Sequence, residues 1–205
     1  MAASLKRIYW DACAWIALIQ KEKIRDDKGI IIEDRETMCK TVIEASKNGK
    51  AEIVTSALSL VEVCKNQDIK EKNADKIAAF FEHEFILLAN LDRDTGERAR
   101  ELMLIGYSKL KPPDAVHVAT AALTNSDEMH TFDGRLLDLD GLIDKPNGEK
   151  LRICKPDFGA PLPLVEAAAI AQAPNCDTGV AHDDGIIENF ALAYIRKYSS
   201  DWGMF

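Results

Sequence analysis

Apolar and polar residues follow one another in short blocks up to about residue 158, and the spacing within each block predicts its secondary structure. Short β-favouring runs predict five strands, at residues 8–10, 51–56, 85–91, 128–132 and 151–156. Apolar residues three and four places apart predict helices from Trp15 to Ile19 and over residues 36–47, 57–65, 74–84, 92–107 and 112–124. This alternation predicts an α/β fold, in which a mostly parallel central sheet carries helices on both faces.

The pattern changes after Phe158. Prolines interrupt an alanine-rich stretch, and the segment "IIENFALAYIRKY" near the end then has helical spacing. We therefore expect residues 1–158 to form one α/β domain. Residues 159–205 are expected to form a C-terminal extension that consists of a linker and an amphipathic helix.

Composition narrows the classes of protein that fit this pattern. The formal net charge of −8 does not indicate the basic face that nucleic-acid-binding proteins usually show, although basic clusters occur at residues 21–25 and 107–111. No apolar run approaches the roughly 20 residues that a membrane-spanning helix needs. The five cysteines form no CxxC pair, which argues against a disulfide framework and a zinc site and favours a reducing cytoplasm.

Four acidic residues stand out because of their places relative to the predicted strands. Asp11 follows the first strand and Asp133 follows the fourth, while Asp114 begins the helix that precedes the fourth strand. Glu62 lies in the helix after the second strand. Because the carboxyl ends of parallel strands meet at one edge of a sheet, we expect all four side chains to approach one another there.

Each of the four also has a purely structural interpretation. Asp11 and Asp114 are each placed to cap a helix. Glu62 is interpreted as a carboxylate in an early helix turn, where the helix dipole favours it. Asp133 is a typical turn residue before Gly134. Four independent caps need not converge, whereas a metal site must, so convergence decides between the two interpretations.

The chemistry of such a cluster is restricted. Two carboxylates about 5 Å apart repel each other by roughly 3 kcal/mol at an effective dielectric constant of about 20. Four can stay ionised together only beside a cation. An all-oxygen set selects Mg²⁺ or Mn²⁺, ions that commonly bind substrate phosphates, which indicates hydrolysis or transfer at phosphorus. His117, one turn after Asp114, could face the site, although a core position is the more usual one for such a histidine.

Four segments carry a resemblance to a known family. They are "IYWDACAWIALI", "VTSALSLVEV", "PPDAVHVATAAL" and "HTFDGRLL". In this order and at these spacings the chain resembles the PIN-domain ribonucleases, and among them the VapC-like toxins of VapBC-type toxin–antitoxin modules. The resemblance covers residues 7–156 and implies a PIN-like three-layer fold.

The resemblance also implies a site and an activity. Asp11 and Asp114 would be the principal ligands of Mg²⁺ or Mn²⁺, and Glu62 and Asp133 would complete the cluster. The implied activity is that of a metal-dependent endoribonuclease, a toxin with an RNA substrate and an antitoxin-like protein partner, and a homodimer is expected. The alternative is a catalytically inactive PIN-like module that binds protein or RNA. Cys13 stands where the family commonly has serine or threonine.

Overall fold

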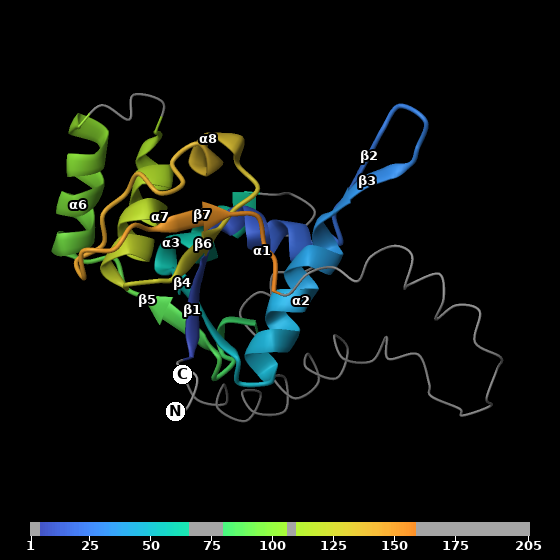
Figure 1. Cartoon of the computed structure of the whole chain (residues 1–205), viewed down its shortest axis with the longest axis horizontal. Coiled ribbons are helices and arrows are strands. Elements are labelled where there is room, and N and C mark those ends of the chain that lie inside the picture. Colours follow the sequence, from blue (N-terminus) through green and yellow to red (C-terminus); the bar gives the residue numbers. More distant parts are fainter. Residues whose placement is uncertain (1–4, 66–79, 106–109, 159–205) are drawn as a thin grey trace, which may run out of the picture. The chain divides into compact units, whose positions relative to one another are not determined.

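The computed structural model describes residues 5–65, 80–105 and 110–158 (Figure 1). Its main feature is a five-stranded sheet in the order β5-β4-β1-β6-β7, with every pair of neighbours parallel. The strands are β1 (Lys6–Trp10), β4 (Ala51–Ser56), β5 (Ile86–Ala89), β6 (Glu128–His130) and β7 (Arg152–Cys154). The predicted parallel sheet is therefore confirmed: β4 has the predicted bounds, β1 begins two residues earlier than predicted, and β5, β6 and β7 are shorter than predicted.

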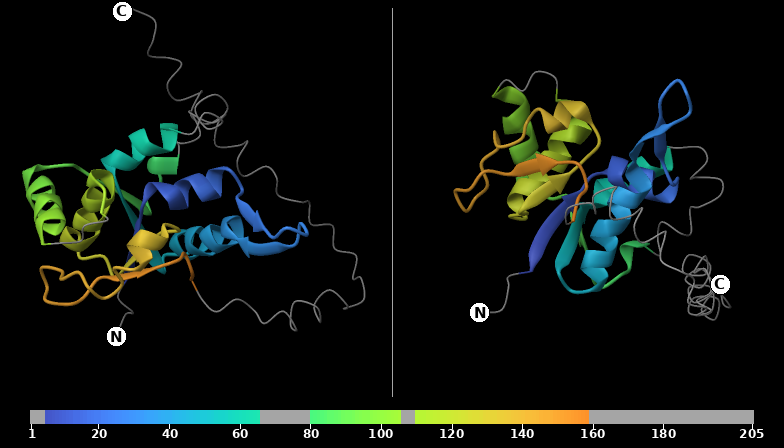
Figure 2. Two further views of the ribbon diagram at one scale, coloured as in Figure 1. Left: turned by 90° about the horizontal axis from the view of Figure 1, so that it is seen from above. Right: turned by 45° about the vertical axis from the view of Figure 1, so that its right-hand side comes forward.

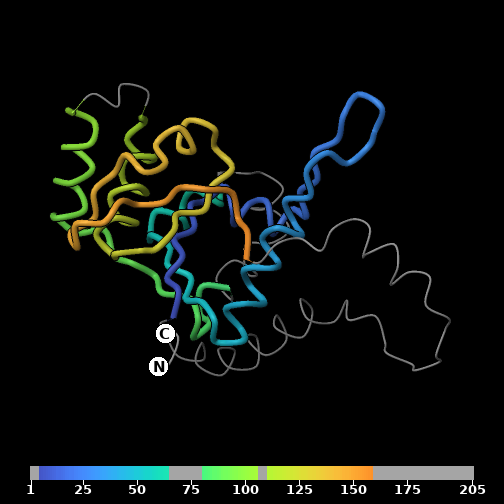
Figure 3. The backbone as a smooth tube through the Cα atoms, in the orientation of Figure 1, coloured from blue at the N-terminus to red at the C-terminus, as the bar shows by residue number. Residues whose placement is uncertain are grey.

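The strand order places β1 in the middle of the sheet. The chain adds β4 and then β5 on one side of β1, and returns to add β6 and β7 on the other side, as Figure 3 traces. Trp10, the last residue of β1, pairs with Thr55 of β4 and His130 of β6. Residues that follow Trp10 and His130 therefore border the point where the strand order reverses. Open α/β sheets commonly bind ligands at this point.

Helices cover both faces of the sheet, which confirms the predicted three layers (Figures 1 and 2). They are α1 (Ala12–Ile19), α2 (Arg35–Lys47), α3 (Ala57–Glu62), a 3-10 turn (Val63–Lys65), α6 (Arg93–Leu104), α7 (Pro112–Leu123) and α8 (Gly134–Leu137). Alternate residues of β1 point to opposite faces, so Ile8 and Trp10 pack with α1 and α2, and Tyr9 packs with α6 and α7. The longest described helix has 13 residues, too few to cross a membrane.

Two elements differ from the sequence-based expectation. Strands β2 (Lys23–Arg25) and β3 (Ile31–Asp34) form an antiparallel hairpin that projects from the α1 and α2 side of the sheet, as Figure 2 shows. The hairpin contains most of the basic cluster at 21–25, and it was missed because its apolar residues are largely exposed and show no burial pattern. Most of the helix predicted at 74–84, and the whole extension predicted at 159–205, lie outside the described residues.

The start of α2 provides a test of stability. The Oδ1 atom of Asp34 accepts a hydrogen bond from the backbone N–H of Thr37 at 3.0 Å. Burial alone would raise the pKa of Asp34, but this bond and the neighbouring Lys23 outweigh burial and hold the pKa below its usual 3.8. A carboxylate of this kind stabilises the fold above its unfolded-state pKa, and loses that contribution as the pH falls through the folded-state value.

We therefore expect Asp34→Ala to lower the free energy of unfolding by about 1 kcal/mol at neutral pH. The loss should shrink as the pH falls below 3.8, because Asp34 of the wild-type protein is then increasingly protonated. Urea unfolding of both proteins, at neutral pH and at a pH below 3.8, measures the loss at each pH. Asp27→Ala, at an exposed position of the hairpin, is the control. An equal loss at both pH values would contradict the role of the ionised cap.

Candidate active site

Asp11 lies directly after β1 and is held by three donors. Its Oδ1 atom caps α1 by accepting from the backbone N–H of Ala14 at 3.1 Å, and it also accepts from the thiol of Cys13 at 2.8 Å. Its Oδ2 atom accepts from the Thr131 hydroxyl at 2.6 Å. The side chain is buried, and this burial raises the pKa of Asp11. The interpretation of Asp11 as a helix cap is therefore confirmed. Among the described residues, no lysine or arginine forms an ion pair with Asp11, and Arg135 pairs with Asp114 and Asp133 instead.

Cys13 connects Asp11 to the chain that follows β6. Besides donating to Asp11, its sulfur accepts from the backbone N–H of Phe132 at 3.1 Å. The neighbouring Thr131 hydroxyl accepts from the backbone N–H of Asp133 at 3.0 Å. These bonds connect the chain after β1 to the chain after β6. The sequence analysis did not single out Thr131, because one threonine beside a predicted strand end shows no pattern.

Asp133 and Asp114 share one cation. Asp133 caps α8 by accepting from the backbone N–H of Arg135 at 2.8 Å, and its carboxylate also pairs with the guanidinium of Arg135. The same guanidinium lies 3.6 Å from Oδ2 of Asp114. The hydrogen bonds from Arg135 hold the pKa of Asp133 below its usual range. Sequence reasoning missed Arg135, although it belongs to the quoted segment "HTFDGRLL".

Asp114 does not cap α7, so that expectation was wrong. The cap position is Lys111, and Asp114 is the third helical residue, after Pro112 and Pro113. Because proline has no N–H, the first turn lacks two of the donors that a cap would satisfy. The Oδ2 atom of Asp114 is buried and has no hydrogen-bond partner among the described residues. The positive end of the helix still favours a carboxylate here.

Glu62 is held by a buried histidine. It is the last residue of α3, where the helix dipole disfavours a carboxylate, so the interpretation as an early-turn residue was wrong. Its Oε2 atom lies 2.6 Å from Nε2 of His117, and Nδ1 of His117 lies 2.7 Å from the hydroxyl of Tyr9. His117 is 2% exposed, so the expectation of a core position is right. It nevertheless positions Glu62 beside α7, the helix whose first turn contains Asp114.

Contacts thus connect three of the four acidic residues, and the fourth, Glu62, contacts the helix that carries Asp114. Asp11 is linked through Thr131 to Asp133, Asp133 shares Arg135 with Asp114, and Glu62 is bound to His117 one turn along α7. Within the described ranges, however, no three of the four have their ligand atoms all within 4.8 Å of one another. Convergence to metal-binding distances therefore stays a prediction.

Comparison with known proteins identifies the family. The model of the PIN domain family matches residues 8–142. Among solved structures, the VapC20 toxin of Mycobacterium tuberculosis, described as cleaving the sarcin–ricin loop, is 19% identical with a TM-score of 0.46, and the match covers 62% of this chain and 90% of that chain. A toxin–antitoxin complex from Klebsiella pneumoniae is 22% identical with a TM-score of 0.45, and the match covers 62% of this chain and 86% of that chain. No curated protein matches. Because the family model spans well over half of its length, the chain belongs to the PIN domain family.

Proposed function

We propose that the chain is a metal-dependent endoribonuclease that hydrolyses phosphodiester bonds in RNA at a Mg²⁺ or Mn²⁺ site formed by Asp11, Glu62, Asp114 and Asp133. The observation that carries the proposal is the buried Oδ2 atom of Asp114, which no described protein group satisfies with a hydrogen bond. Buried carboxylate oxygens are normally hydrogen-bonded, so an unsatisfied one beside other acids fits a cation ligand.

The surrounding residues would hold the ligands in place. Ala14 and Thr131 fix the two oxygens of Asp11, and three accepted bonds still leave that carboxylate a lone pair for a cation. His117 fixes the Oε2 atom of Glu62. Side chains already locked by hydrogen bonds bind a cation with little further loss of conformational freedom. A bound Mg²⁺ or Mn²⁺ would activate a water molecule and stabilise charge on the phosphate.

Arg135 supports a second candidate function. Its guanidinium already neutralises part of the charge of Asp114 and Asp133. A site that carries its own cation has less need of a metal ion, and a guanidinium is also a good ligand for RNA phosphates. The second candidate is therefore a catalytically inactive PIN-like module that binds RNA or protein. The first candidate requires Arg135, which is 39% exposed, to swing away from Asp114 when metal binds.

The sequence resemblance extends the proposal to a biological setting. We propose a cytoplasmic toxin with an antitoxin-like protein partner, on the strength of the four VapC-like motifs. The homodimer also remains a proposal. The apolar rings of residues 80–85 give it little support, because Phe80, Phe81 and Phe85 pack against the core cluster that contains Trp15. Phe81 is buried, and Phe80 and Phe85 are each partly covered by this packing.

The experiment that tests the activity uses the full chain with single-stranded and structured RNA. We expect cleavage in Mn²⁺ or Mg²⁺ that stops when EDTA removes the ion. Calorimetry should show Mn²⁺ binding that is lost in the Asp11→Asn/Asp114→Asn double variant. RNA binding without cleavage, together with no Mn²⁺ binding, would instead establish the inactive module.

A further inference from the structure

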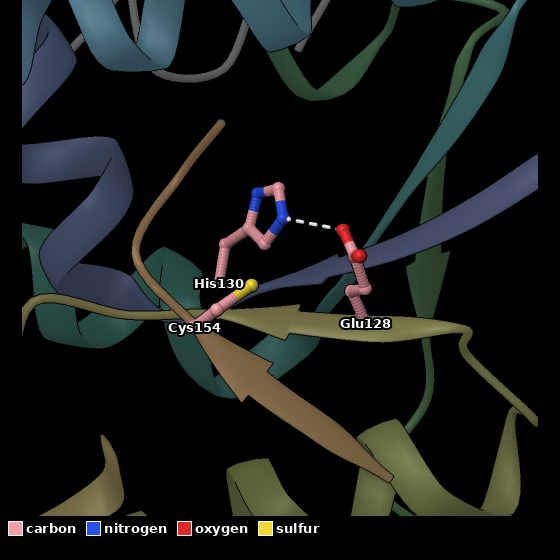
Figure 4. Close-up of side chains that lie close together, drawn as sticks. All are labelled: Glu128, His130 and Cys154. Atoms are coloured by element: carbon pink, nitrogen blue, oxygen red, sulfur yellow. Dashed lines mark hydrogen bonds and ion pairs between the residues drawn. The ribbon is translucent and has the colours of Figure 1, made fainter. Parts of the chain in front are cut away.

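Three side chains of β6 and β7 that the active site does not use lie close together on one face of the sheet. Glu128 and His130 are two residues apart on β6, so they point to the same face. In the parallel pairing of the two strands, His130 is the register partner of Cys154, which places the thiol beside the imidazole. Figure 4 shows the three side chains on the same side of the two strands.

The three side chains form a set of metal ligands. One ligand atom from each residue can be chosen so that all three lie within 4.8 Å of one another. Tetrahedral zinc, with bonds of about 2.0–2.3 Å, separates its ligands by about 3.3–3.8 Å. Small side-chain rotations therefore close the set around an ion. Glu128 and His130 are 5% and 0% exposed, whereas Cys154 is partly open and leaves a route for entry.

We propose that Glu128, His130 and Cys154 form a Zn²⁺ site, separate from the carboxylate site. A thiolate and an imidazole select a borderline-soft ion, whereas the all-oxygen acidic cluster selects hard ions. The site lies on the sheet face that packs with α1 and α2, because Glu128 and His130 pair with Ile8 and Trp10, which face that side. Asp114 and His117, in contrast, lie on α7, which packs on the opposite face.

The hydrogen bonding of His130 suits the exchange of a proton for a metal ion. Its Nε2 atom lies 3.1 Å from Oε2 of Glu128, and its Nδ1 atom is buried without a hydrogen-bond partner among the described residues. Because the carboxylate can only accept, this bond places the proton of the neutral imidazole on Nε2 and leaves the lone pair on Nδ1. When an ion binds at Nε2 the proton can move to Nδ1, and the only hydrogen bond lost is the one to Glu128, which the ion replaces.

Two cations compete with the ion for Glu128. The amino group of Lys6 lies 2.8 Å from Oε2, and the guanidinium of Arg152 lies 2.8 Å from Oε1. Their side chains are 36% and 65% exposed, so both can turn into solvent at small cost. An ion at Oε2 takes the place of Lys6 and leaves Arg152 on the other oxygen. The site would then tie the short strand β7, at the edge of the sheet, to β6.

Co²⁺ is the probe that tests this site, because a cobalt–thiolate bond gives a charge-transfer absorption in the near ultraviolet. The full chain, freed of metal with EDTA, should develop this band up to one equivalent of Co²⁺ and lose it when Zn²⁺ is added. Cys154→Ser should abolish the band. Cys64→Ser, at an exposed cysteine outside the cluster, and Asp114→Asn, in the carboxylate site, should both retain it.

Two further variants test the ligand set without removing the thiol. Glu128→Gln should weaken Co²⁺ binding at least tenfold, whereas Lys6→Met, which removes the competing cation, should strengthen it. Zn²⁺ should raise the melting temperature of the wild-type protein and not that of Cys154→Ser. Absence of the band in the wild-type protein, or its persistence in Cys154→Ser, would overturn the proposal. If Cys154→Ser fails to fold, unchanged affinity in both Glu128→Gln and Lys6→Met would overturn it.

Discussion

Asp114→Asn is expected to remove RNA cleavage while leaving the fold intact. In the proposed function Asp114 is a principal ligand of the ion, and losing such a ligand costs several kcal/mol of transition-state stabilisation, roughly a thousandfold fall in rate. Stability should change by no more than about 1 kcal/mol, because the substitution keeps the shape of the side chain and Oδ2 has no hydrogen bond to lose. The ion pair of Oδ2 with Arg135 is also lost, but at 3.6 Å and with a partly exposed arginine it contributes little. A substitution of Asp114 therefore tests function with little change in stability. A substitution of Asp11 would change both, because Asp11 also caps α1 and accepts a hydrogen bond from Thr131.

The control for this prediction is Asp138→Asn. Asp138 is exposed at the end of α8, so the same chemical change there tests the effect of removing one negative charge from this part of the surface. Initial rates of RNA cleavage in saturating Mn²⁺ and urea unfolding of all three proteins make the comparison. A rate for Asp114→Asn within tenfold of the wild-type rate would exclude Asp114 as a principal ligand.

The parallel sheet was predictable because its strands are buried. Residues Ile8 to Trp10 and Ile53 to Val54 give apolar runs without alternation, the pattern of strands covered on both faces. The hairpin of β2 and β3 could not be predicted in this way, since Ile30 and Ile32 are 60% and 64% exposed. Its apolar residues do not contact a core, so their spacing along the chain shows no period that predicts a strand.

The acidic residues of the candidate site were found from the sequence, but most of the residues that hold them were not. The bond from Thr131 to Asp11 joins residues 120 positions apart, and its existence depends on the pairing of β1 with β6. His117 was noticed, but its role beside Glu62 depends on how α3 and α7 pack. Arg135 follows from the geometry of the short helix α8, which the sequence analysis did not predict.

The cluster of Glu128, His130 and Cys154 could not be predicted from the sequence either. The absence of a CxxC pair argued against a zinc site, because that test looks for ligands close together in sequence. Here two ligands are brought to one face by the two-residue repeat of β6, and the third comes from the neighbouring strand. Only the strand register places Cys154 beside His130.

Trp15→Ala is expected to cause the largest loss of stability. The side chain is 0% exposed, and its ring lies 4.7 Å from that of Trp10 and 5.0 Å from that of Phe81, measured between centroids. Removing a buried aromatic ring costs about 3–5 kcal/mol, a large fraction of the stability of a small domain. Urea unfolding, followed by circular dichroism, measures the loss.

Trp15→Phe separates ring packing from hydrogen bonding in this prediction. It keeps an aromatic ring but loses the bond from Nε1 to the Thr55 hydroxyl, which spans 3.0 Å. That hydroxyl still bonds to the backbone oxygen of Trp10 at 2.8 Å, so we expect a smaller loss, of about 1–2 kcal/mol. Equal losses in the two variants would show that the hydrogen bond, and not the ring, joins α1 to the sheet. The expected difference instead means that aromatic packing fixes the helix whose first turn is capped by Asp11.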